Sequence, residues 1–81
     1  MRISIVCFGK MRDYLPQGTP GNRAELDVGP DAIVADAIDA LGAPRSEVVA
    51  LLVDGRQAGL GEKLVEGAEV TLMPQFTGGA T

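Results

Sequence analysis

The chain has 81 residues, which is enough for one domain around one small core. It contains no histidine, so the commonest general base and metal ligand is missing. The single cysteine, Cys7, excludes an internal disulfide and a four-cysteine iron–sulfur site. The net charge is −4 and the seven cations are scattered, which excludes the basic stripe of a nucleic-acid binder. No apolar stretch has the length of a membrane span or a signal peptide, so we expect a cytoplasmic protein without nucleic-acid or membrane partners.

Two short strands are predicted in the first third of the chain. Apolar and polar residues alternate over residues 2–8 and again over residues 24–28, which is the period of a strand with one face on a core. The intervening residues 10–22 are rich in proline, glycine and charge, which predicts a loop with at most one helical turn. We expect the two strands to pair as a hairpin.

One helix is predicted in the middle of the chain. Asp31 is placed as its N-cap, where a carboxylate accepts bonds from unpaired backbone N–H groups. Apolar residues at helical spacing then form a single stripe: Val34, Ala37, Ile38 and Leu41. Gly42 stands where the end of a helix favours a left-handed residue, and Pro44 prevents the helix from continuing.

The run of apolar residues 48–53 predicts a strand covered on both faces, and we place it centrally in the sheet. Asp54-Gly55 directly after it is a strong turn signal. Residues 56–66 show only weak strand or 3₁₀ character. Within them, Leu60 and Leu64 are expected to anchor the segment to the core.

A last strand and a tail complete the chain. After a turn at Gly67, alternation over residues 70–74 predicts the final strand. We therefore expect a domain of residues 1–74 followed by a flexible C-terminal tail, residues 75–81. The order of elements fits an α+β fold of the β-grasp (ubiquitin-like) type. In that fold one main helix packs across a mixed sheet, here of four to five strands, and the first and last strands are parallel neighbours.

The predicted domain offers no convincing catalytic group. Cys7 lies on the core side of the first strand, where a thiol is structural. Two carboxylate pairs have no further metal ligand beside them and are interpreted as solvated faces or turns: Asp36 with Asp39, and Glu66 with Glu69. Gly59-Leu60-Gly61 lacks the preceding strand, the lysine and the following helix of a phosphate loop. We therefore expect no metal, no bound cofactor and no enzymatic activity of the chain's own.

The tail carries the features that packing does not explain. Phe76 lies beyond the last strand, where it either folds back over the sheet edge or anchors a partner. Gly78 and Gly79 have no side chains, so this part of the chain can thread through a narrow tunnel into the active site of another enzyme. A carboxylate presented there can be activated as an acyl-adenylate and attacked by a sulfur donor. The partner then supplies the catalysis, which agrees with the missing histidine.

Nearly the whole chain resembles the family of ubiquitin-like sulfur carriers, chiefly the small subunit of molybdopterin synthase (MoaD) and, more distantly, the thiamin sulfur carrier (ThiS). The matching segments are Phe8-Gly9-Lys10-Met11-Arg12-Asp13; Val34, Ile38 and Leu41; Val53-Asp54-Gly55-Arg56; Leu64 through Gly67 to Glu69-Val70; and Met73-Pro74-Gln75-Phe76-Thr77-Gly78-Gly79. The most specific part is the proline-containing strand end followed by Thr-Gly-Gly.

The resemblance implies a definite chemistry. An adenylyltransferase of the ubiquitin-activating type would use ATP to adenylate Gly79, which then becomes a thiocarboxylate. Gly79 would donate this sulfur inside an acceptor enzyme such as the large subunit of molybdopterin synthase, with Gly78 and Thr77 threading the tail. Molybdenum cofactor biosynthesis is the favoured pathway, and thiamin, cysteine or another sulfur-containing product stays open. The resemblance also indicates candidate docking residues: Phe8, Met73 and Phe76.

Two features depart from the family's pattern. Gln75 stands where the family usually has a second proline. The chain also continues past Gly79 with Ala80-Thr81, which displaces the free carboxylate by about 7 Å. Since a misplacement of about 1 Å in a reacting group can cost about a hundredfold in rate, we expect a peptidase to remove Ala80-Thr81 first.

Two other functions stay open at this point. One is a ubiquitin-like interaction module that binds through its sheet and has no tail chemistry. The other is a protein modifier joined to lysines through Gly79. The fate of the C-terminus discriminates among them: sulfur in place of oxygen indicates a carrier, an isopeptide remnant a modifier, and neither an interaction module.

Overall fold

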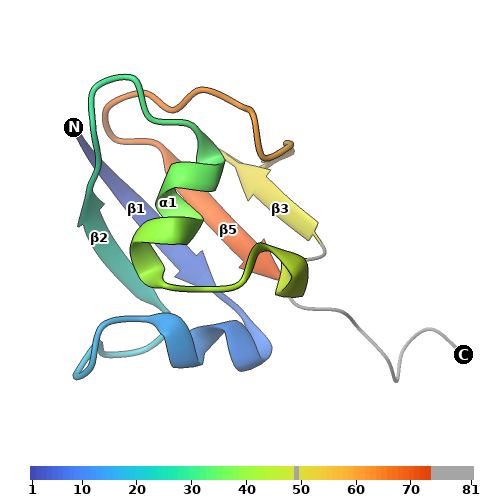
Figure 1. The fold of residues 1–81 in the computed structure, drawn as a ribbon. Helices are drawn as coiled ribbons and strands as arrows, with labels where there is room; N and C mark the ends of the chain where they lie inside the picture. The colour runs from blue at the N-terminus through green and yellow to red at the C-terminus, as the bar shows by residue number, and fades with distance from the viewer. Residues whose placement is uncertain (49, 74–81) are drawn as a thin grey trace, which may run out of the picture.

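The structure, a computed structural model, describes residues 1–48 and 50–73 of the chain. Within these ranges it contains five strands, one α-helix and two 3₁₀ helices (Figure 1). In chain order they are β1 (Arg2–Cys7), η1 (Gly9–Tyr14), β2 (Arg23–Asp27), α1 (Val34–Leu41), η2 (Arg45–Glu47), β3 (Ala50–Val53), β4 (Arg56–Gln57) and β5 (Glu69–Met73).

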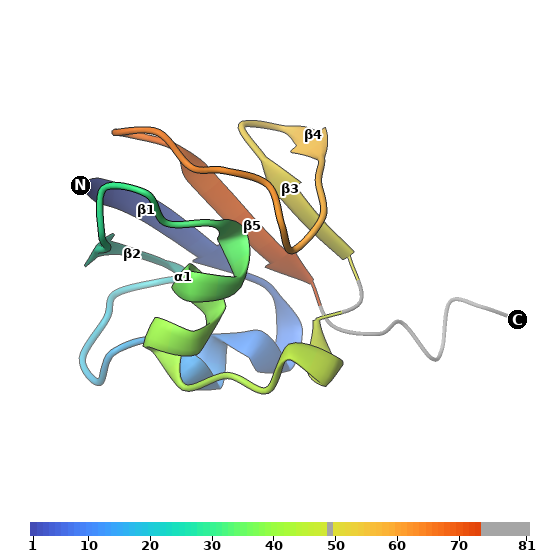
Figure 2. The same ribbon diagram turned by 45° about the horizontal axis from the view of Figure 1, so that its top comes forward.

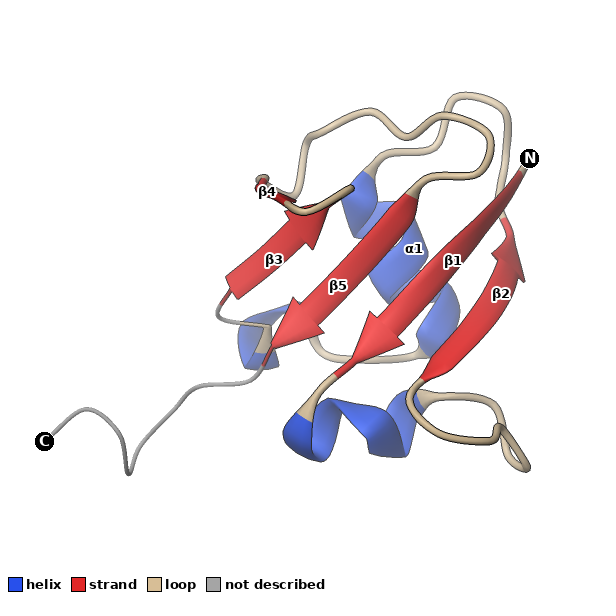
Figure 3. Cartoon of the chain, turned by 180° about the vertical axis from the view of Figure 1, so that it is seen from behind, coloured by secondary structure: helices blue, strands red, loops and turns tan. Residues whose placement is uncertain are grey.

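The strands form one mixed sheet in the order β2-β1-β5-β3-β4. The first and last strands, β1 and β5, are parallel neighbours, with Ser4 opposite Glu69 and Cys7 opposite Leu72. The other neighbouring pairs, β1–β2, β3–β5 and β3–β4, are antiparallel. Figure 3 looks onto this sheet, with α1 behind it. The predicted β-grasp fold, with its hairpin, its crossing helix and its parallel first and last strands, is confirmed.

The core lies between the sheet and α1, because β1 alternates as the sequence predicted. One face of β1 is buried through Ile3, Ile5 and Cys7. These side chains belong to the same cluster as the buried stripe of α1 and the inward residues of β5: Val34, Ala37, Ile38, Val70 and Leu72. In Figure 2, α1 crosses this one face of the sheet. Removing the apolar side chains from water is the main favourable term that holds the domain together.

The start of α1 differs from the prediction. Asp31 is not its N-cap, since the helix begins at Val34 and the N-cap residue is Ile33. The apolar Ile33 side chain has no acceptor to offer, but the Asp36 carboxylate accepts a hydrogen bond from the Ile33 N–H at 2.9 Å. The carboxylate that caps the helix thus lies after its first residue and not before it.

A distant loop takes over the role that was assigned to Asp31. The N–H groups of Val34 and Ala35 donate to the carbonyl oxygens of Glu62 and Leu60, at 2.9 and 3.0 Å. The unpaired N–H groups of a helix start are therefore satisfied by tertiary contacts. The end of the helix agrees with the prediction, because Gly42 has a left-handed backbone with φ of 77°.

The prediction that residues 48–53 form a central strand covered on both faces is wrong. β3 begins at Ala50, lies between β5 and β4, and alternates between half-buried and buried residues. The centre of the sheet is β5, in which Val70, Thr71 and Leu72 are all buried. An apolar run indicates that a strand is covered, but its place in the sheet depends on a pairing partner from a later part of the chain.

The segment after β3 is predicted in part. Asp54 and Gly55 both have positive φ, at 52° and 85°, as a type I′ turn between antiparallel strands requires. Leu64 is buried and anchors the following loop. The side chain of Leu60 is 39% exposed, so its predicted role as an anchor is wrong. Leu60 contributes its backbone carbonyl to the start of α1 instead.

The loop predicted over residues 10–22 contains more helix than expected. The 3₁₀ helix η1 runs for six residues, or about two turns, where at most one was predicted. The reason is burial of Met11, which is completely enclosed in the core together with Leu15. A single apolar residue among charged and proline-rich neighbours gives no periodic signal in the sequence.

The fold makes a first testable prediction about stability. Replacing the fully buried Ile38 by alanine should lower the free energy of unfolding by about 2–5 kcal/mol, a large part of the roughly 4–12 kcal/mol expected for a domain of this length. Val65→Ala is the matched control, because that side chain is 63% exposed and its loss should change stability by less than about 0.5 kcal/mol. Urea unfolding of both variants checks the result, and equal losses would contradict the placement of the core.

Candidate functional site

The site is built at the end of the sheet where β5 stops at Met73 and the chain continues toward its C-terminus. We call this part of the domain the exit end; it comprises η1, η2 and the carboxyl ends of β1 and β5. Figures 1 and 2 show η1 and η2 on this side of the sheet, away from the N-terminus. The Phe8 N–H donates to the carbonyl oxygen of Leu72 at 3.1 Å, so the pairing of β1 with β5 extends to the exit end.

The exit end is held in place from inside the core. The fully buried side chain of Met11 anchors η1 in the core. The Met11 N–H also donates to the Phe8 carbonyl oxygen at 3.1 Å. The Tyr14 hydroxyl donates to the Glu47 carboxylate at 2.8 Å, which joins η1 to η2. This hydrogen bond, together with burial and the nearby negative charge, raises the pKa of Tyr14. Both 3₁₀ helices are therefore fixed relative to the sheet.

The face of the sheet away from α1 carries an apolar surface that reaches the exit end. Val6 lies opposite Thr71 of β5, Thr71 lies opposite Leu52 of β3, and Met73 lies opposite Ala50. Phe8 extends β1 in an extended conformation and is 44% exposed. We call these six residues the open face: Val6, Phe8, Ala50, Leu52, Thr71 and Met73. Val6 and Thr71 are buried within it, Ala50, Leu52 and Met73 are half-buried, and Phe8 is exposed. The side of the sheet away from α1 points toward the viewer in Figure 3.

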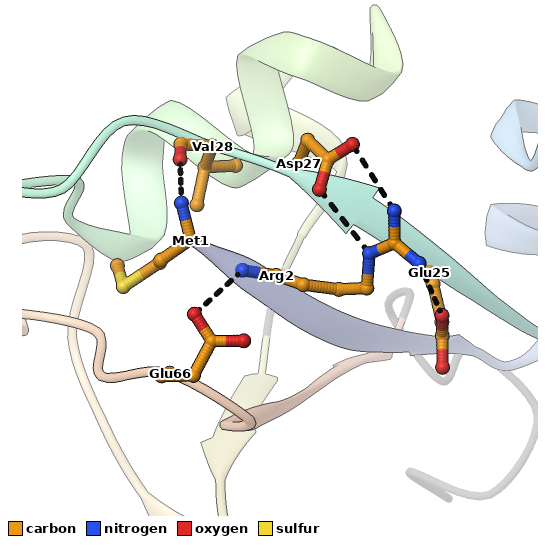
Figure 4. Close-up of polar contacts among 6 residues, drawn as sticks. All are labelled: Met1, Arg2, Glu25, Asp27, Val28 and Glu66. Carbon is orange, nitrogen blue, oxygen red and sulfur yellow. Dashed lines mark hydrogen bonds and ion pairs between the residues drawn. The ribbon is translucent and has the colours of Figure 1, made fainter.

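Charged residues border the open face on the side of β2. The Arg2 guanidinium donates to Asp27 at 3.2 and 3.4 Å and to Glu25 at 3.4 Å (Figure 4). The hydrogen bond from Arg2 lowers the pKa of Asp27. Arg23 forms a further ion pair with Glu69 of β5. These side chains are solvent-exposed, so they shape the rim of the surface and add little to stability.

The backbone beneath this border is also fixed. The amine of Met1 donates to the Val28 carbonyl oxygen at 2.7 Å, and the Arg2 N–H donates to the Glu66 carboxylate at 3.1 Å, as Figure 4 shows. The amino end of β1 is thereby joined to β2 on one side and to the loop before β5 on the other.

The structure brings two of the predicted docking residues together. Phe8 and Met73 are far apart in sequence, but the parallel pairing of β1 with β5 places both at the exit end. Phe76, the threading residues Thr77 and Gly78, and Gly79 lie outside the described residues, and their predicted roles stay predictions.

Sequence reasoning missed part of the open face. Val6, Leu52 and Thr71 were not singled out, although they fill its centre. A signal for one of them exists, because Val6 is an apolar residue on the side of the first strand that otherwise carries Arg2 and Ser4. The other two could not be selected without the strand order.

The candidate nucleophile and acids of the described residues have structural roles. Cys7 is fully buried, and burial raises the pKa of its thiol to about 11. Each member of the two carboxylate pairs has a partner within the domain. Asp36 caps α1, and Asp39 accepts hydrogen bonds from Arg45 at 3.1 and 2.6 Å. Glu66 accepts a hydrogen bond from the Arg2 N–H, and Glu69 forms an ion pair with Arg23. Residues 1–48 and 50–73 contain no cluster of three or more side chains that could hold a metal ion. In the same ranges no helix is long and apolar enough to cross a membrane.

The family follows from the sequence profile that the chain matches. The profile of the Mut7-C ubiquitin family covers residues 1–79. The chain belongs to this family. Its predicted ubiquitin-like nature is confirmed, and the match includes the diglycine of the tail.

Solved structures of other ubiquitin-like proteins agree with this assignment. The chain is 27% identical to SAMP1 from Haloferax volcanii, with 96% of this chain and 99% of that one covered and a TM-score of 0.73. A second structure, of H. volcanii small archaeal modifier protein 1, gives 26% identity, 93% and 98% coverage and a TM-score of 0.72. A putative molybdopterin converting factor subunit 1 from Pyrococcus furiosus has 19% identity, 93% and 98% coverage and a TM-score of 0.69, and so supports the fold. No functionally curated protein has a sequence that matches the chain significantly.

The burial of Cys7 makes a second testable prediction. The native thiol should not react measurably with a disulfide reagent such as DTNB near pH 8, whereas the denatured chain should react at once. Because the thiol binds its proton more tightly when folded, its contribution to stability is complete below about pH 9 and is lost as the pH rises toward about 11. A Cys7→Ala variant should lack this loss. Rapid labelling of the native protein would contradict the assignment of Cys7 to the core.

Proposed function

We propose that this chain is a sulfur-carrier protein whose reactive group is the carboxylate of Gly79. One observation carries the proposal: the β1–β5 pairing puts Phe8 and Met73 of the open face at the exit end, directly before the segment that ends in Thr77-Gly78-Gly79. A partner that docks on this surface is adjacent to the segment that it has to receive. Membership of a ubiquitin-like family and the match through residue 79 support this role.

The proposed reaction takes place in partner enzymes. An adenylyltransferase of the ubiquitin-activating type joins the Gly79 carboxylate to the α-phosphate of ATP and releases pyrophosphate. A sulfur nucleophile then attacks the acyl carbon and displaces AMP, which leaves a thiocarboxylate. The carrier contributes a substrate group and a docking surface. This division fits a domain in which Cys7 is enclosed and the carboxylates of Asp36 and Glu66 accept hydrogen bonds from backbone N–H groups.

The acceptor enzyme decides the pathway. We propose molybdenum cofactor biosynthesis, with the large subunit of a molybdopterin synthase as acceptor, because one similar fold is that of a putative molybdopterin converting factor subunit. Neither ATP nor another cofactor needs to bind to the carrier itself. We place the carrier and these partner enzymes in the cytoplasm.

The residues after Gly79 require a processing step. Ala80-Thr81 follow Gly79, so the carbonyl group of Gly79 is part of a peptide bond and is not a free carboxylate. We propose that a peptidase removes the residues after Gly79 before activation.

A second candidate function is favoured by the names of two similar proteins. One H. volcanii structure, 27% identical to this chain, is named SAMP1. The other, 26% identical, is named small archaeal modifier protein 1. Activation of Gly79 would be the same in a modifier, but the acyl group would pass to a lysine amine of another protein instead of accepting sulfur. An isopeptide remnant on other proteins would identify this function.

The processing proposal makes a third prediction. A chain truncated after Gly79 should be adenylated by the cognate activating enzyme at least about a hundredfold faster than the full-length chain, because only its carboxylate reaches the α-phosphate. ATP–pyrophosphate exchange measures the step, and mass spectrometry of the product detects replacement of oxygen by sulfur. Equal rates for both forms would contradict the processing proposal, and no exchange with either form would contradict the carrier function.

The open face makes a fourth prediction. Phe8→Ala should raise the KM of the activating enzyme for the truncated carrier by about tenfold, as expected for loss of an exposed aromatic side chain from a contact. Val65→Ala removes a more exposed apolar side chain at the other end of the domain and should leave the KM unchanged. If the two variants behave alike, the docking surface does not include Phe8.

A further inference from the structure

The charges of the domain are divided unequally between its two ends. Eight carboxylate and three cationic side chains lie at the amino end of β1 and β5, in the adjoining part of β2, and in the loops and helix start beside them. Their formal charge is −5, to which the amine of Met1 at the same end adds +1. The side chains are Glu25, Asp27, Asp31, Asp36, Asp54, Glu62, Glu66 and Glu69 with Arg2, Arg56 and Lys63. The exit end, as defined above, has two carboxylates and three cations and a charge of +1: Asp13 and Glu47 with Lys10, Arg12 and Arg45. Arg23 of β2 and Asp39 of α1 belong to neither set, and they form ion pairs with Glu69 and Arg45.

The cations also differ in whether they have partners. Four of the seven take part in ion pairs within the chain: Arg2, Arg23, Arg45 and Arg56. Among residues 1–48 and 50–73, no ion pair includes Lys10, Arg12 or Lys63. Two of these three unpaired cations, Lys10 and Arg12, lie together on η1. Within the described residues, their charges can therefore meet another molecule without breaking an ion pair.

The position of Lys10 and Arg12 is defined by the core. Met11 between them is fully buried, so the helix that carries both cations cannot turn over without exposing it. Arg12 lines a hollow of about 340 Å³ in the surface between η1 and the following loop, with Asp13, Pro16 and Thr19 among its other lining residues. Phe8, directly before η1, supplies an exposed apolar contact. The exit end therefore combines an aromatic ring, two unpaired cations and a hollow.

We infer that the tail-receiving partner binds the exit end through an acidic surface, in which carboxylates meet Lys10 and Arg12 beside an apolar contact for Phe8. The negative charge at the opposite end is repelled by the same acidic surface, so the domain approaches with its exit end first. Rim charges of this kind act mainly on the rate of association and on its dependence on salt. This inference rests on the proposed carrier function for the choice of partner, the activating enzyme.

The test compares two charge reversals with the same effect on net charge. Lys10→Glu lies at the exit end and Lys63→Glu at the acidic end; both residues are exposed lysines without an ion pair in the described part of the chain. In the chain truncated after Gly79, Lys10→Glu should raise the KM for the activating enzyme of the same organism by about tenfold at low salt, with kcat unchanged. Lys63→Glu should stay within about twofold of the unchanged sequence. The difference should shrink as ionic strength rises to about 0.5 M, because salt screens exposed charges.

A third variant tests the sign of the partner's charge. Asp13→Asn removes the carboxylate that shares the hollow with Arg12, so it should lower the KM. Similar effects of Lys10→Glu and Lys63→Glu would overturn the inference, because net charge alone would then explain them. A lower KM for Lys10→Glu would overturn it by indicating a basic partner surface.

A binding measurement without ATP separates this inference from the carrier function. One outcome is that the unsubstituted chain binds the enzyme, that Lys10→Glu weakens this binding, and that Gly79 is not adenylated. In that case the docking inference stands and the carrier function fails. If Gly79 is adenylated and Lys10→Glu binds as well as Lys63→Glu, the carrier function stands and the docking inference fails. Absence of binding by the unsubstituted chain contradicts both.

Discussion

The parallel pairing of β1 with β5 is the contact on which the rest of the structure depends. It joins the beginning of the chain to the end of its described part at the middle of the sheet. The buried side chains of both strands pack against α1. The same strand pairing extends to Phe8 at the exit end. The core and the open face are thus two faces of one strand pair. A change that separated these strands would remove both.

This arrangement agrees with the proposal that the domain serves chemistry performed by partner enzymes. Its one thiol is enclosed, and the carboxylates considered as acids hold a helix start, an N–H group or an arginine. What the described part of the domain presents outward is the open face with its exposed Phe8, bordered by charge, next to the point where the chain continues. The unequal distribution of charge adds direction to that surface, because exposed ion pairs contribute little to stability but influence how partners approach.

The sequence predicted the fold further than it predicted the site. Alternation in the first and last strands, the apolar stripe of α1, Gly42 and the Asp54-Gly55 turn were sufficient for the β-grasp fold, since each signal is local. The errors have a common cause in contacts between distant segments. Asp31 was predicted to cap the start of α1, but carbonyl groups of a later loop accept the hydrogen bonds of the helix start. The strand containing Ala50 was predicted at the centre of the sheet, where β5 lies. For the site, Phe8 and Met73 were indicated by resemblance, whereas Val6 was not singled out although a weak pattern marks it.

The sequence by itself determined the periodicities, the absence of histidine, the net charge and the order of the elements, because these depend only on which residues follow one another. The tertiary structure decided which strand is central, that Met11 enters the core, and that Phe8 lies beside the end of β5. It also decided that the unpaired cations of η1 lie at the opposite end from most of the carboxylates. Each of these depends on hydrogen bonds and packing between segments far apart in the chain, and no local pattern encodes the partner of such a contact.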